Sequence, residues 1–299
     1  MRIPRILHHI FLDGEEEYFK TTEEATALGS GMKREWRESC IAAHPNWTYM
    51  FWDRAAALKL LNNRYPWFTK TFLSYRKVVS QGDALRPFLM HAFGGMYLDL
   101  DVSCYKSSEP FLQGHDLVFQ SEKNEEDVSN AVVASITGHP FWNAVVRKMI
   151  VEAKRANEKV LDSGSILTTT GPNVFKEVFQ RWVEYVRPEP PYGGQYMVHG
   201  SRVKYYPRGH WFVPCLWDDV ACHRGINELA AAGTPNVQLA GHHQFTGSWL
   251  GSLNDPTPEL ARPKGDTNDP SDTMAEAHTK EKRRLKLSLH QNRRQNRSI

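Results

Sequence analysis

Two carboxylates, one residue apart, follow a pair of glycines near the middle of the first half of the chain. In the segment GGMYLDLDVS, residues 94–103, Asp99 and Asp101 interrupt an otherwise apolar run. Read as one strand, the segment places both aspartates on one side and its apolar residues on the other. Two unpaired carboxylates this close repel each other and resist removal from water, so a bound cation is the simplest way to keep both ionised. Oxygen ligands favour a hard ion such as Mn²⁺ or Mg²⁺.

Neighbouring residues strengthen this interpretation, because an Asp-x-Asp triplet alone is a weak signal. Gly94 and Gly95 remove side chains where the chain turns into the strand, which allows another backbone or a ligand to approach closely. Asp83 and Arg86 are three residues apart in a helical pattern over 83–93, so they share one face of that helix. The planar guanidinium of Arg86 suits phosphate or carboxylate groups. The segment therefore predicts an acidic metal site beside an anion-binding arginine.

The elements that must position these residues follow an α/β pattern. Apolar residues 6–12 and aromatic-rich residues 44–53 predict two strands, with a helix between them over 32–43. The helix over 83–93 stops at the glycine pair, and Pro87 is compatible with it only near its first turn. A strand, a helix and a strand in this order are typical of an α/β fold.

Later segments continue the same organisation. A strong helix is predicted from Pro140 to about residue 160, and its apolar stripe is expected to face the core. The segment TTTGPNVF, residues 168–175, predicts a turn into another helix. From about residue 255 large apolar side chains become rare. We therefore expect one catalytic domain over residues 1–254 and a polar, disordered tail over residues 255–299.

Charge is distributed unevenly along the 299 residues. The formal net charge is +3, but the last twenty residues contain eight Lys or Arg and one Glu, so the chain without this +7 is at about −4. A mildly acidic body argues against a nucleic-acid partner. The basic tail leaves open a peripheral contact with anionic lipid head groups, and a solvated tail is the simpler interpretation.

Targeting signals and cysteines set few limits. No apolar run is long enough to span a bilayer, and the N-terminal MRIPRILHHIFLDG has too short an apolar stretch for a signal peptide. The cysteines Cys40, Cys104, Cys215 and Cys222 are too few for a disulfide scaffold, and they leave the redox compartment open. Cys215, Cys222 and His223 lack the spacing of a usual zinc site, so we do not expect one there.

An ordered set of segments resembles the DXD-containing family 32 glycosyltransferases. The segments are IPRILHHIFLDG, HPNWTYMFWD, YPWF, GDALRPFLMHAFGGMYLDLDVSC, SNAVVASITGHPFW, TTTGP and GHHQFTGSW, and they span roughly residues 3–250. Within the family the chain looks most similar to the inositol phosphoceramide mannosyltransferases and, more distantly, to the initiating α-1,6-mannosyltransferases. Seven segments in order are far more specific than a single triplet.

The resemblance implies a GT-A type fold, a Rossmann-like α/β domain with a mixed central sheet. It also implies a divalent metal, usually Mn²⁺, and a nucleotide-sugar donor, most simply GDP-mannose, whose hexose is transferred with retention to a glycan or glycolipid acceptor. A metal on the leaving diphosphate would stabilise the charge that develops as the glycosidic bond breaks. Relatives are expected in the Golgi or the secretory pathway, and the missing signal peptide leaves a cytoplasmic location open.

The resemblance also assigns roles around the two aspartates. Asp101 matches the direct metal ligand, and Asp99 matches a carboxylate that contacts the ribose and the metal shell. Asp83 and Arg86 match a pair expected at the donor sugar and the diphosphate. Tyr97 matches an aromatic residue that lines the same pocket.

Three more residues are candidates for the nucleotide sugar. Phe11 stands where relatives often carry a tryptophan beside the base, and it can stack without offering an indole N–H. Leu12 follows it at the same place. A buried strand aromatic is the alternative for Phe11. Asn130 is a candidate for the sugar side, although an asparagine before a strand also commonly caps a turn.

A last group comes from the segment GHHQFTGSW. His242, His243, Ser248 and Trp249 match a His-His and Ser-Trp pattern that, by resemblance, closes over the diphosphate. One histidine would complete the metal shell, and Trp249 would donate to a phosphate oxygen. Histidines in strands are also often ordinary structural residues. Pro87 departs from the family, because relatives carry an aromatic residue after the arginine.

Two other functions stay open at this level. Asp99 and Asp101 after an apolar strand also resemble the nucleophile strand of haloacid-dehalogenase-type phosphatases, with Asp218 and Asp219 as later metal ligands, but Ser103 fills a place that usually holds Thr or Val. A catalytically silent nucleotide-sugar or glycan-binding module is the second. No enzymatic nucleophile is evident, which favours front-face transfer assisted by the leaving phosphate.

Overall fold

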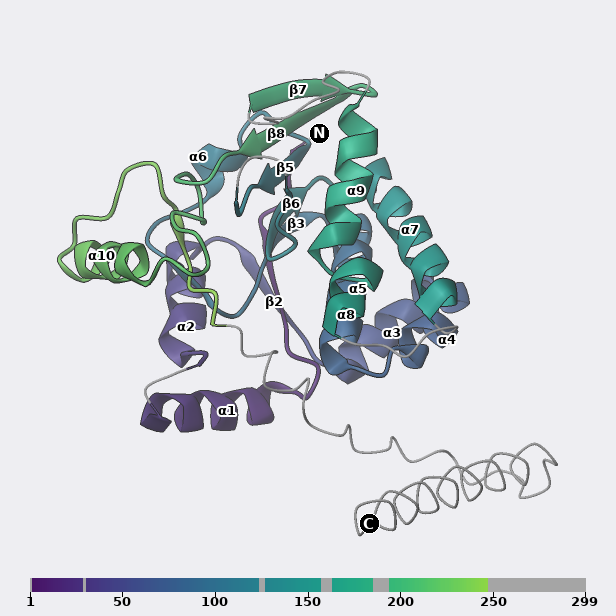
Figure 1. The fold of residues 1–299 in the computed structure, drawn as a ribbon, viewed down its shortest axis with the longest axis horizontal. Coiled ribbons are helices and arrows are strands. Elements are labelled where there is room, and N and C mark those ends of the chain that lie inside the picture. The colour runs from purple at the N-terminus through teal and green to yellow at the C-terminus, as the bar shows by residue number, and fades with distance from the viewer. Residues whose placement is uncertain (1, 29–30, 124–126, 157–162, 185–193, 247–299) are drawn as a thin grey trace, which may run out of the picture. The chain divides into compact units, whose positions relative to one another are not determined.

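The computed structural model describes residues 2–28, 31–123, 127–156, 163–184 and 194–246 (Figure 1). Its helices are α1 (Glu15–Leu28), α2 (Arg34–Ala43), α3 (Arg54–Arg64), α4 (Pro66–Ser74), α5 (Val78–Phe93), α6 (Glu109–Leu112), α7 (Pro140–Ala156), α8 (Ser163–Thr169), α9 (Pro172–Val183) and α10 (Val220–Ala231). Its strands are β1 (Ile6–Ile10), β2 (Thr48–Trp52), β3 (Gly95–Leu98), β4 (Val102–Cys104), β5 (Leu117–Gln120), β6 (Val132–Ser135), β7 (Gly194–Val198), β8 (Ser201–Tyr206) and β9 (Gly241–His243).

Seven of these strands form one mixed sheet in the order β2-β1-β3-β6-β5-β8-β7. The pairs β1–β2, β1–β3 and β5–β8 are parallel, and the pairs β3–β6, β5–β6 and β7–β8 are antiparallel. Helices α5, α7, α8 and α9 cover one side of the sheet, and α2 and α10 lie on the other (Figure 1). The predicted α/β class with a mixed central sheet is confirmed.

Apolar side chains form two clusters, one on each face of the sheet. In β3, Met96 and Leu98 join one cluster and Tyr97 joins the other, because successive side chains of a strand point to opposite faces. In β5, Val118 and Phe119 divide in the same way. The larger cluster packs against α3, α4, α5, α7 and α9, so α5 is fixed on the sheet by burial along its length.

The glycine pair before β3 is required by neighbouring backbone. Gly94 and Gly95 have positive φ values of 64° and 92°. A Cβ on Gly94 would lie 2.6 Å from the backbone N of Thr137, and one on Gly95 would lie 2.5 Å from the carbonyl O of Ile6. The sequence left open whether another backbone or a ligand approaches the glycines. The structure shows that another backbone does so.

Helix α5 is longer than predicted. It begins at Val78, so Pro87 lies inside the helix and the expectation that this proline lies near the first turn is wrong. Pro87 has no N–H to donate to the carbonyl of Asp83, four residues earlier. The helix nevertheless continues to Phe93, because most of its residues are buried against the sheet and the neighbouring helices.

The predicted single strand through the two aspartates is also wrong. Strand β3 ends at Leu98, and β4 begins at Val102 and belongs to a separate two-stranded sheet with β9. The backbone N–H of Val102 donates to the carbonyl of Asp99 at 3.1 Å, which closes a turn between the strands. Asp99 and Asp101 therefore lie in a turn instead of alternating along a strand. The partner of β4 comes from far along the chain, which a local pattern does not show.

Other predicted elements agree with the structure. Strands β1 and β2 and helix α2 lie inside their predicted ranges, α7 begins at Pro140, and α9 follows the TTTGP turn. In the part of the chain that the structure describes, no helix is both long and apolar enough to cross a membrane. The predicted domain boundary near residue 254 and the basic tail lie outside the described residues.

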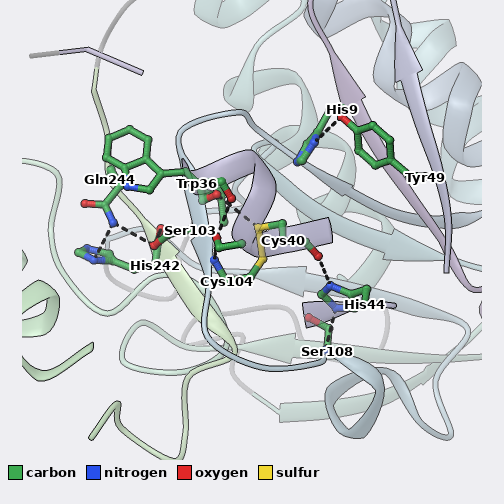
Figure 2. Close-up of a disulfide and its surroundings, with 12 residues drawn as sticks. His9, Trp36, Cys40, His44, Tyr49, Ser103, Cys104, Ser108, His242 and Gln244 are labelled. Atoms are coloured by element: carbon green, nitrogen blue, oxygen red, sulfur yellow. Dashed lines mark hydrogen bonds between the residues drawn. A yellow bond between two sulfur atoms is a disulfide. The ribbon is translucent and has the colours of Figure 1, made fainter. Parts of the chain in front are cut away.

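All four cysteines form disulfides. The bond between Cys40 and Cys104 joins α2 to β4 (Figure 2), and a second bond joins Cys215 to Cys222. The backbone N–H of Cys104 also donates to the Ser39 hydroxyl at 2.9 Å. Strand β4, and with it the turn that holds the two aspartates, is therefore attached to α2 by a covalent bond and a hydrogen bond.

His8 in β1 has a fixed protonation state. Its Nδ1 accepts from the indole N–H of Trp52 at 3.0 Å, so Nε2 carries the proton and donates to the carbonyl of Gly94 at 2.9 Å. Burial lowers the pKa of His8 to about 4, against the opposing effect of the Gly94 hydrogen bond. Protonation at Nδ1 would remove the Trp52 contact.

We expect the free energy of unfolding to fall as the pH drops from 6.5 towards 4. The unfolded chain protonates His8 at its ordinary pKa whereas the folded chain does not, so stability is present above the unfolded pKa and is lost as the pH falls. The full loss from this residue is about 3 kcal/mol. Urea unfolding of the wild type and of His8→Gln over this range should show a stability difference that shrinks with falling pH; a constant difference would contradict the assignment.

Candidate active site

Side chains from distant parts of the sequence meet at one edge of the main sheet. Strands β1 and β3 are parallel, so their C-terminal ends lie at the same edge, and antiparallel β6 brings the residues before it to that edge. The backbone N–H of Asp99 accordingly donates to the carbonyl of Ala131 at 2.9 Å. Helix α5 adds Asp83 and Arg86, and the Nη1 of Arg86 donates to the carbonyl of Asn130 at 2.9 Å.

Arg86 joins two carboxylates. Its Nη2 lies 2.7 Å from Oδ1 of Asp99 and 3.0 Å from Oδ1 of Asp83. The hydroxyl of Tyr97 also donates to Oδ1 of Asp99, and the guanidinium carbon lies 4.8 Å from the centre of the Tyr97 ring. The amide of Asn130 donates to Oδ1 of Asp83 at 3.1 Å. One guanidinium thus sets the positions of both acids.

The charges in this group are incompletely balanced. Burial raises the pKa of Asp83 to about 7, although Arg86 acts to lower it. Burial likewise raises the pKa of Asp99 against the opposing effect of Arg86. The pKa of Arg86 is raised, because Asp99, Tyr97 and Asp83 outweigh the burial that acts to lower it. A further positive charge near Asp99 would therefore be stabilised.

Asp101 is held by the C-terminal part of the described chain. Its Oδ1 lies 3.2 Å from Nε2 of His243, and its Oδ2 accepts from the N–H and the hydroxyl of Thr246 at 3.0 and 3.1 Å. Burial acts to raise the pKa of Asp101, but His243 and Thr246 outweigh it and lower the pKa to about 2. Burial acts to lower the pKa of His243, and Asp101 outweighs it, so that pKa is raised.

Asp99, Asp101 and His243 form a candidate metal centre. Each offers one ligand atom, and these atoms lie within 4.8 Å of one another. Asp99 is the most exposed of the site's acids, with 24% of its side chain accessible, against 13% for Asp101 and 7% for Asp83. Two carboxylates and an imidazole suit a divalent ion such as Mn²⁺. In the described part of the chain, buried His243 Nδ1 lacks a hydrogen-bond partner.

The structure separates the two histidines that the sequence grouped together. His243 and His242 alternate along β9, which pairs with β4 in the register Val102 to His243 and Ser103 to His242. His243 therefore faces the aspartates, whereas Nε2 of His242 lies 2.7 Å from Nδ1 of His223. The structure does not bring His242 to the Asp99–Asp101 cluster.

The remaining sequence candidates occupy different environments. Phe11 follows β1 at the same sheet edge, is partly exposed, and lies edge-on to Tyr18 at 5.6 Å between ring centres. The side chain of Leu12 is buried in the larger apolar cluster, and its carbonyl accepts from the N–H of Arg54. Ser248 and Trp249 lie outside the described residues.

Two residues near the site, Thr246 and Glu122, were not predicted from the sequence. Thr246 donates two hydrogen bonds to Asp101, and the sequence feature that could have indicated this role is its position inside the GHHQFTGSW segment. Glu122 follows β5, and burial raises the pKa of its carboxyl although His243 and a hydrogen bond from Ser129 act to lower it. The N–H of Glu122 donates to Asp127 at 3.1 Å. A charged residue in a polar loop gives no indication that its side chain faces the acidic cluster.

Comparisons with known proteins find related glycosyltransferases. Residues 32–118 match a family model described as the glycosyltransferase sugar-binding region containing DXD motif, a range that holds Asp83, Arg86, Tyr97, Asp99 and Asp101. Over 183 residues the chain is 30% identical to mannosyl phosphorylinositol ceramide synthase CSH1 of Saccharomyces cerevisiae. This alignment covers 60% of this chain and 44% of that protein. Over 180 residues it is 29% identical to inositol phosphoceramide mannosyltransferase 3 of Schizosaccharomyces pombe, which covers 60% and 46%.

A solved structure, the PaToxG glycosyltransferase, aligns with a TM-score of 0.41 at 15% identity over 62% of this chain and 70% of that chain. The resemblance to the DXD-containing glycosyltransferases is confirmed by the family match and the curated relatives. The first of these relatives is named as a mannosyl phosphorylinositol ceramide synthase and the second as an inositol phosphoceramide mannosyltransferase. The chain spans about half the length of the curated relatives it matches.

We expect Arg86→Met to lower the free energy of unfolding by about 3–5 kcal/mol, because two buried carboxylates lose their shared cation. Adding Asp83→Asn should restore part of this loss, since one of the two charges is then removed. Denaturant unfolding measures both changes. Arg155→Met is the matched control: the side chain of Arg155 is 68% exposed and its partner Glu152 keeps an ion pair with Lys148, so the loss should cost about 1 kcal/mol or less. Equal costs for the two arginines would refute the proposed pairing.

Mn²⁺ affinity should increase with pH. A metal ligand must be deprotonated, and the pKa of His243 is raised above the ordinary value of 6.5, so a proton competes with the metal up to neutral pH. Titration calorimetry at about pH 6 and about pH 8 should give tighter binding at the higher pH. His243→Gln should bind Mn²⁺ more weakly and lose most of this dependence. Identical affinity of the wild type at both pH values would exclude His243 as a ligand.

Proposed function

We propose that this protein is a metal-dependent retaining glycosyltransferase that transfers mannose from GDP-mannose to a glycan or glycolipid acceptor. The observation that supports this most directly is the placement of Asp99, Asp101 and His243 beside the Asp83–Arg86 pair. Asp99, Asp101 and His243 offer ligand atoms for a metal cation. The Asp83–Arg86 pair offers a guanidinium and hydrogen-bonding groups at the same sheet edge. A sugar diphosphate needs a cation for its phosphates and hydrogen-bonding groups for its sugar.

The donor set fits a divalent metal, Mn²⁺ or Mg²⁺. Asp101 and His243 share a contact of 3.2 Å that a cation can replace, and Asp99 is the most exposed acid beside them. When bound, the metal would neutralise charge on the departing diphosphate. His243 and Thr246 lower the pKa of Asp101 and keep its carboxylate ionised, which leaves it ready to bind a cation at neutral pH.

The other residues orient the donor. Arg86 and Tyr97 hold Oδ1 of Asp99 in a fixed position, so this carboxylate is preorganised before a ligand arrives. The amide of Asn130 donates to Asp83, which contacts the same guanidinium nitrogen as Asp99, and we assign Asp83 and Asn130 to the hydroxyl groups of the transferred sugar. Phe11 is assigned to the base, because it is a partly exposed aromatic at the end of β1.

An inositol-containing lipid is the acceptor class that the curated relatives suggest, since one is named for mannosyl phosphorylinositol ceramide and the other for inositol phosphoceramide. Near the acidic cluster, Glu122 lines a cavity of about 180 Å³ together with Asp127, Asn173 and Lys176. Carboxylate, amide and ammonium groups are suited to a polyhydroxylated head group. We assign this cavity to the acceptor side.

The disulfides support an oxidising compartment. Cys40–Cys104 and Cys215–Cys222 would not persist in a reducing cytosol. We therefore propose that the chain works in the secretory pathway, with the Golgi as the expected site. Contact of the basic tail with anionic lipid is a proposal from sequence alone.

The phosphatase alternative is not favoured. Asp219 caps α10 by accepting from the N–H of Cys222 at 2.9 Å, and both Asp218 and Asp219 are exposed. Neither belongs to the Asp99–Asp101 metal group. The cap of α10 is therefore a structural role for Asp219. The intact acidic cluster and its arginine likewise argue against a silent binding module.

We expect GDP-mannose, in a panel of nucleotide sugars with Mn²⁺, to give the fastest hydrolysis and the largest thermal stabilisation. Asp101→Ala should reduce Mn²⁺-dependent hydrolysis by about 100-fold or more, because a group that holds charge in the transition state is removed. Released GDP, measured by chromatography, gives the rate.

Asp218→Asn is the matched control and should leave hydrolysis unchanged, since its carboxylate is exposed and outside the cluster. Unchanged hydrolysis in Asp101→Ala would refute the metal assignment. Phosphate release from a phosphomonoester that depends on Asp218, without turnover of any nucleotide sugar, would favour the phosphatase instead.

A further inference from the structure

A second group of side chains that could bind a metal lies between α10 and β9, on the opposite face of β9 from His243 and the acidic cluster. Cys215, His223 and His242 place ligand atoms within 4.8 Å of one another, and Cys222 is bonded to Cys215. The Cα atoms of the two cysteines are 5.8 Å apart. The sequence spacing of Cys215, Cys222 and His223 argued against zinc, but the structure adds His242 from β9 as a fourth residue.

The two imidazole rings face each other through their nitrogen atoms. Nδ1 of His223 lies 2.7 Å from Nε2 of His242, and the ring planes are inclined by only 10°. Nε2 of His223 lies 2.8 Å from the carbonyl of Leu216, so this nitrogen carries the proton and the facing Nδ1 carries a lone pair. His223 is therefore already in the tautomer that a metal ligand requires.

His242 has hydrogen-bonding partners for either of its tautomers. Its Nδ1 lies 3.1 Å from Oδ1 of Asn227 and 3.1 Å from the amide nitrogen of Gln244, a contact visible in Figure 2. When Gln244 donates to Nδ1, Nε2 of His242 donates to His223, which satisfies the metal-free pair. When Nδ1 donates to Asn227, both facing nitrogens carry lone pairs. Hydrogen bonds of this kind on the outer nitrogen fix the tautomer of metal-bound histidines.

We propose that Cys215, Cys222, His223 and His242 form a zinc site when the disulfide between the two cysteines is reduced. Two thiolates and two imidazoles are the Cys₂His₂ set of closed, tetrahedral structural zinc sites. Zinc at its usual bond lengths needs the two facing nitrogens about 3.3 Å apart, so the rings separate slightly on binding. The proposal does not depend on the transferase activity, since it uses none of the residues assigned to it.

The reduction requires a dithiol. One thiolate of the reductant attacks a cysteine sulfur, the Sγ–Sγ bond breaks, and the second thiolate closes the disulfide of the reductant, so two electrons pass to the protein. Cys215 and Cys222 are then thiols. Zn²⁺ displaces their two protons to solvent and forms two Zn–S and two Zn–N bonds. Helix α10 and strand β9 would then be joined through the ion instead of through hydrogen bonds alone.

The test is zinc content of the full chain with and without reduction. The protein is treated with a dithiol, freed of it by anaerobic gel filtration, incubated with Zn²⁺ and desalted, and metal is measured by mass spectrometry. We expect one zinc per chain that the oxidised protein does not retain. Co²⁺ in place of zinc should give the visible bands of a tetrahedral site with thiolate charge transfer. No difference in retained metal between the reduced and oxidised protein would overturn the proposal.

Variants locate the ion. Cys222→Ser and His223→Ala should lose the retained metal, and circular dichroism shows whether each variant is folded. Cys40→Ser/Cys104→Ser removes the other disulfide and should keep the zinc. Asp101→Asn should also keep it, because it changes only the acidic cluster. Retention in folded His223→Ala, or loss in Asp101→Asn, would place the zinc elsewhere and contradict the assignment.

Discussion

A single guanidinium between the buried carboxylate of Asp83 and the partly exposed carboxylate of Asp99 is the interaction on which the candidate active site depends. Arg86 contacts Asp83 on its own helix and Asp99 in the turn after β3, so it connects α5 to the candidate metal-binding turn. Charges that are largely removed from water are tolerated only when they are paired. Because one positive charge serves two negative ones, the site retains a deficit that a divalent cation can fill. The stability of the fold and the affinity for metal therefore have a common source.

The second half of the metal centre depends on a long-range strand pairing. Strand β9 brings His243 opposite Val102, directly after the two aspartates. This pairing needs Gly241, because a Cβ there would lie 2.1 Å from the carbonyl O of Ser103. The bond between Cys40 and Cys104 holds the other side of β4 to α2. Strand β4 is thus attached to β9 on one side and to α2 on the other, which fixes the turn that holds the two aspartates.

Local patterns in the sequence predicted the α/β class, the beginning of α7 and the grouping of acids with an arginine, because these follow from periodicity and from spacing within one helix. They failed where contacts with distant segments of the chain determine the structure. The strand through Asp99 was predicted too long, since the end of β3 is set by its neighbours and β4 pairs with a segment near residue 242. For the same reason Thr246 and Glu122 were missed, and His242 was placed with His243 although strand alternation separates them.

The central claim is that Asp99, Asp101 and His243 hold a divalent cation that carries the nucleotide diphosphate. A crystal structure with Mn²⁺ and GDP, using anomalous scattering at the manganese edge, tests it most directly. The account predicts one manganese peak bounded by Asp101 and His243, with the diphosphate of GDP on the side of Asp99. A peak elsewhere, or GDP bound away from this sheet edge with Asp101 still paired to His243, would contradict it.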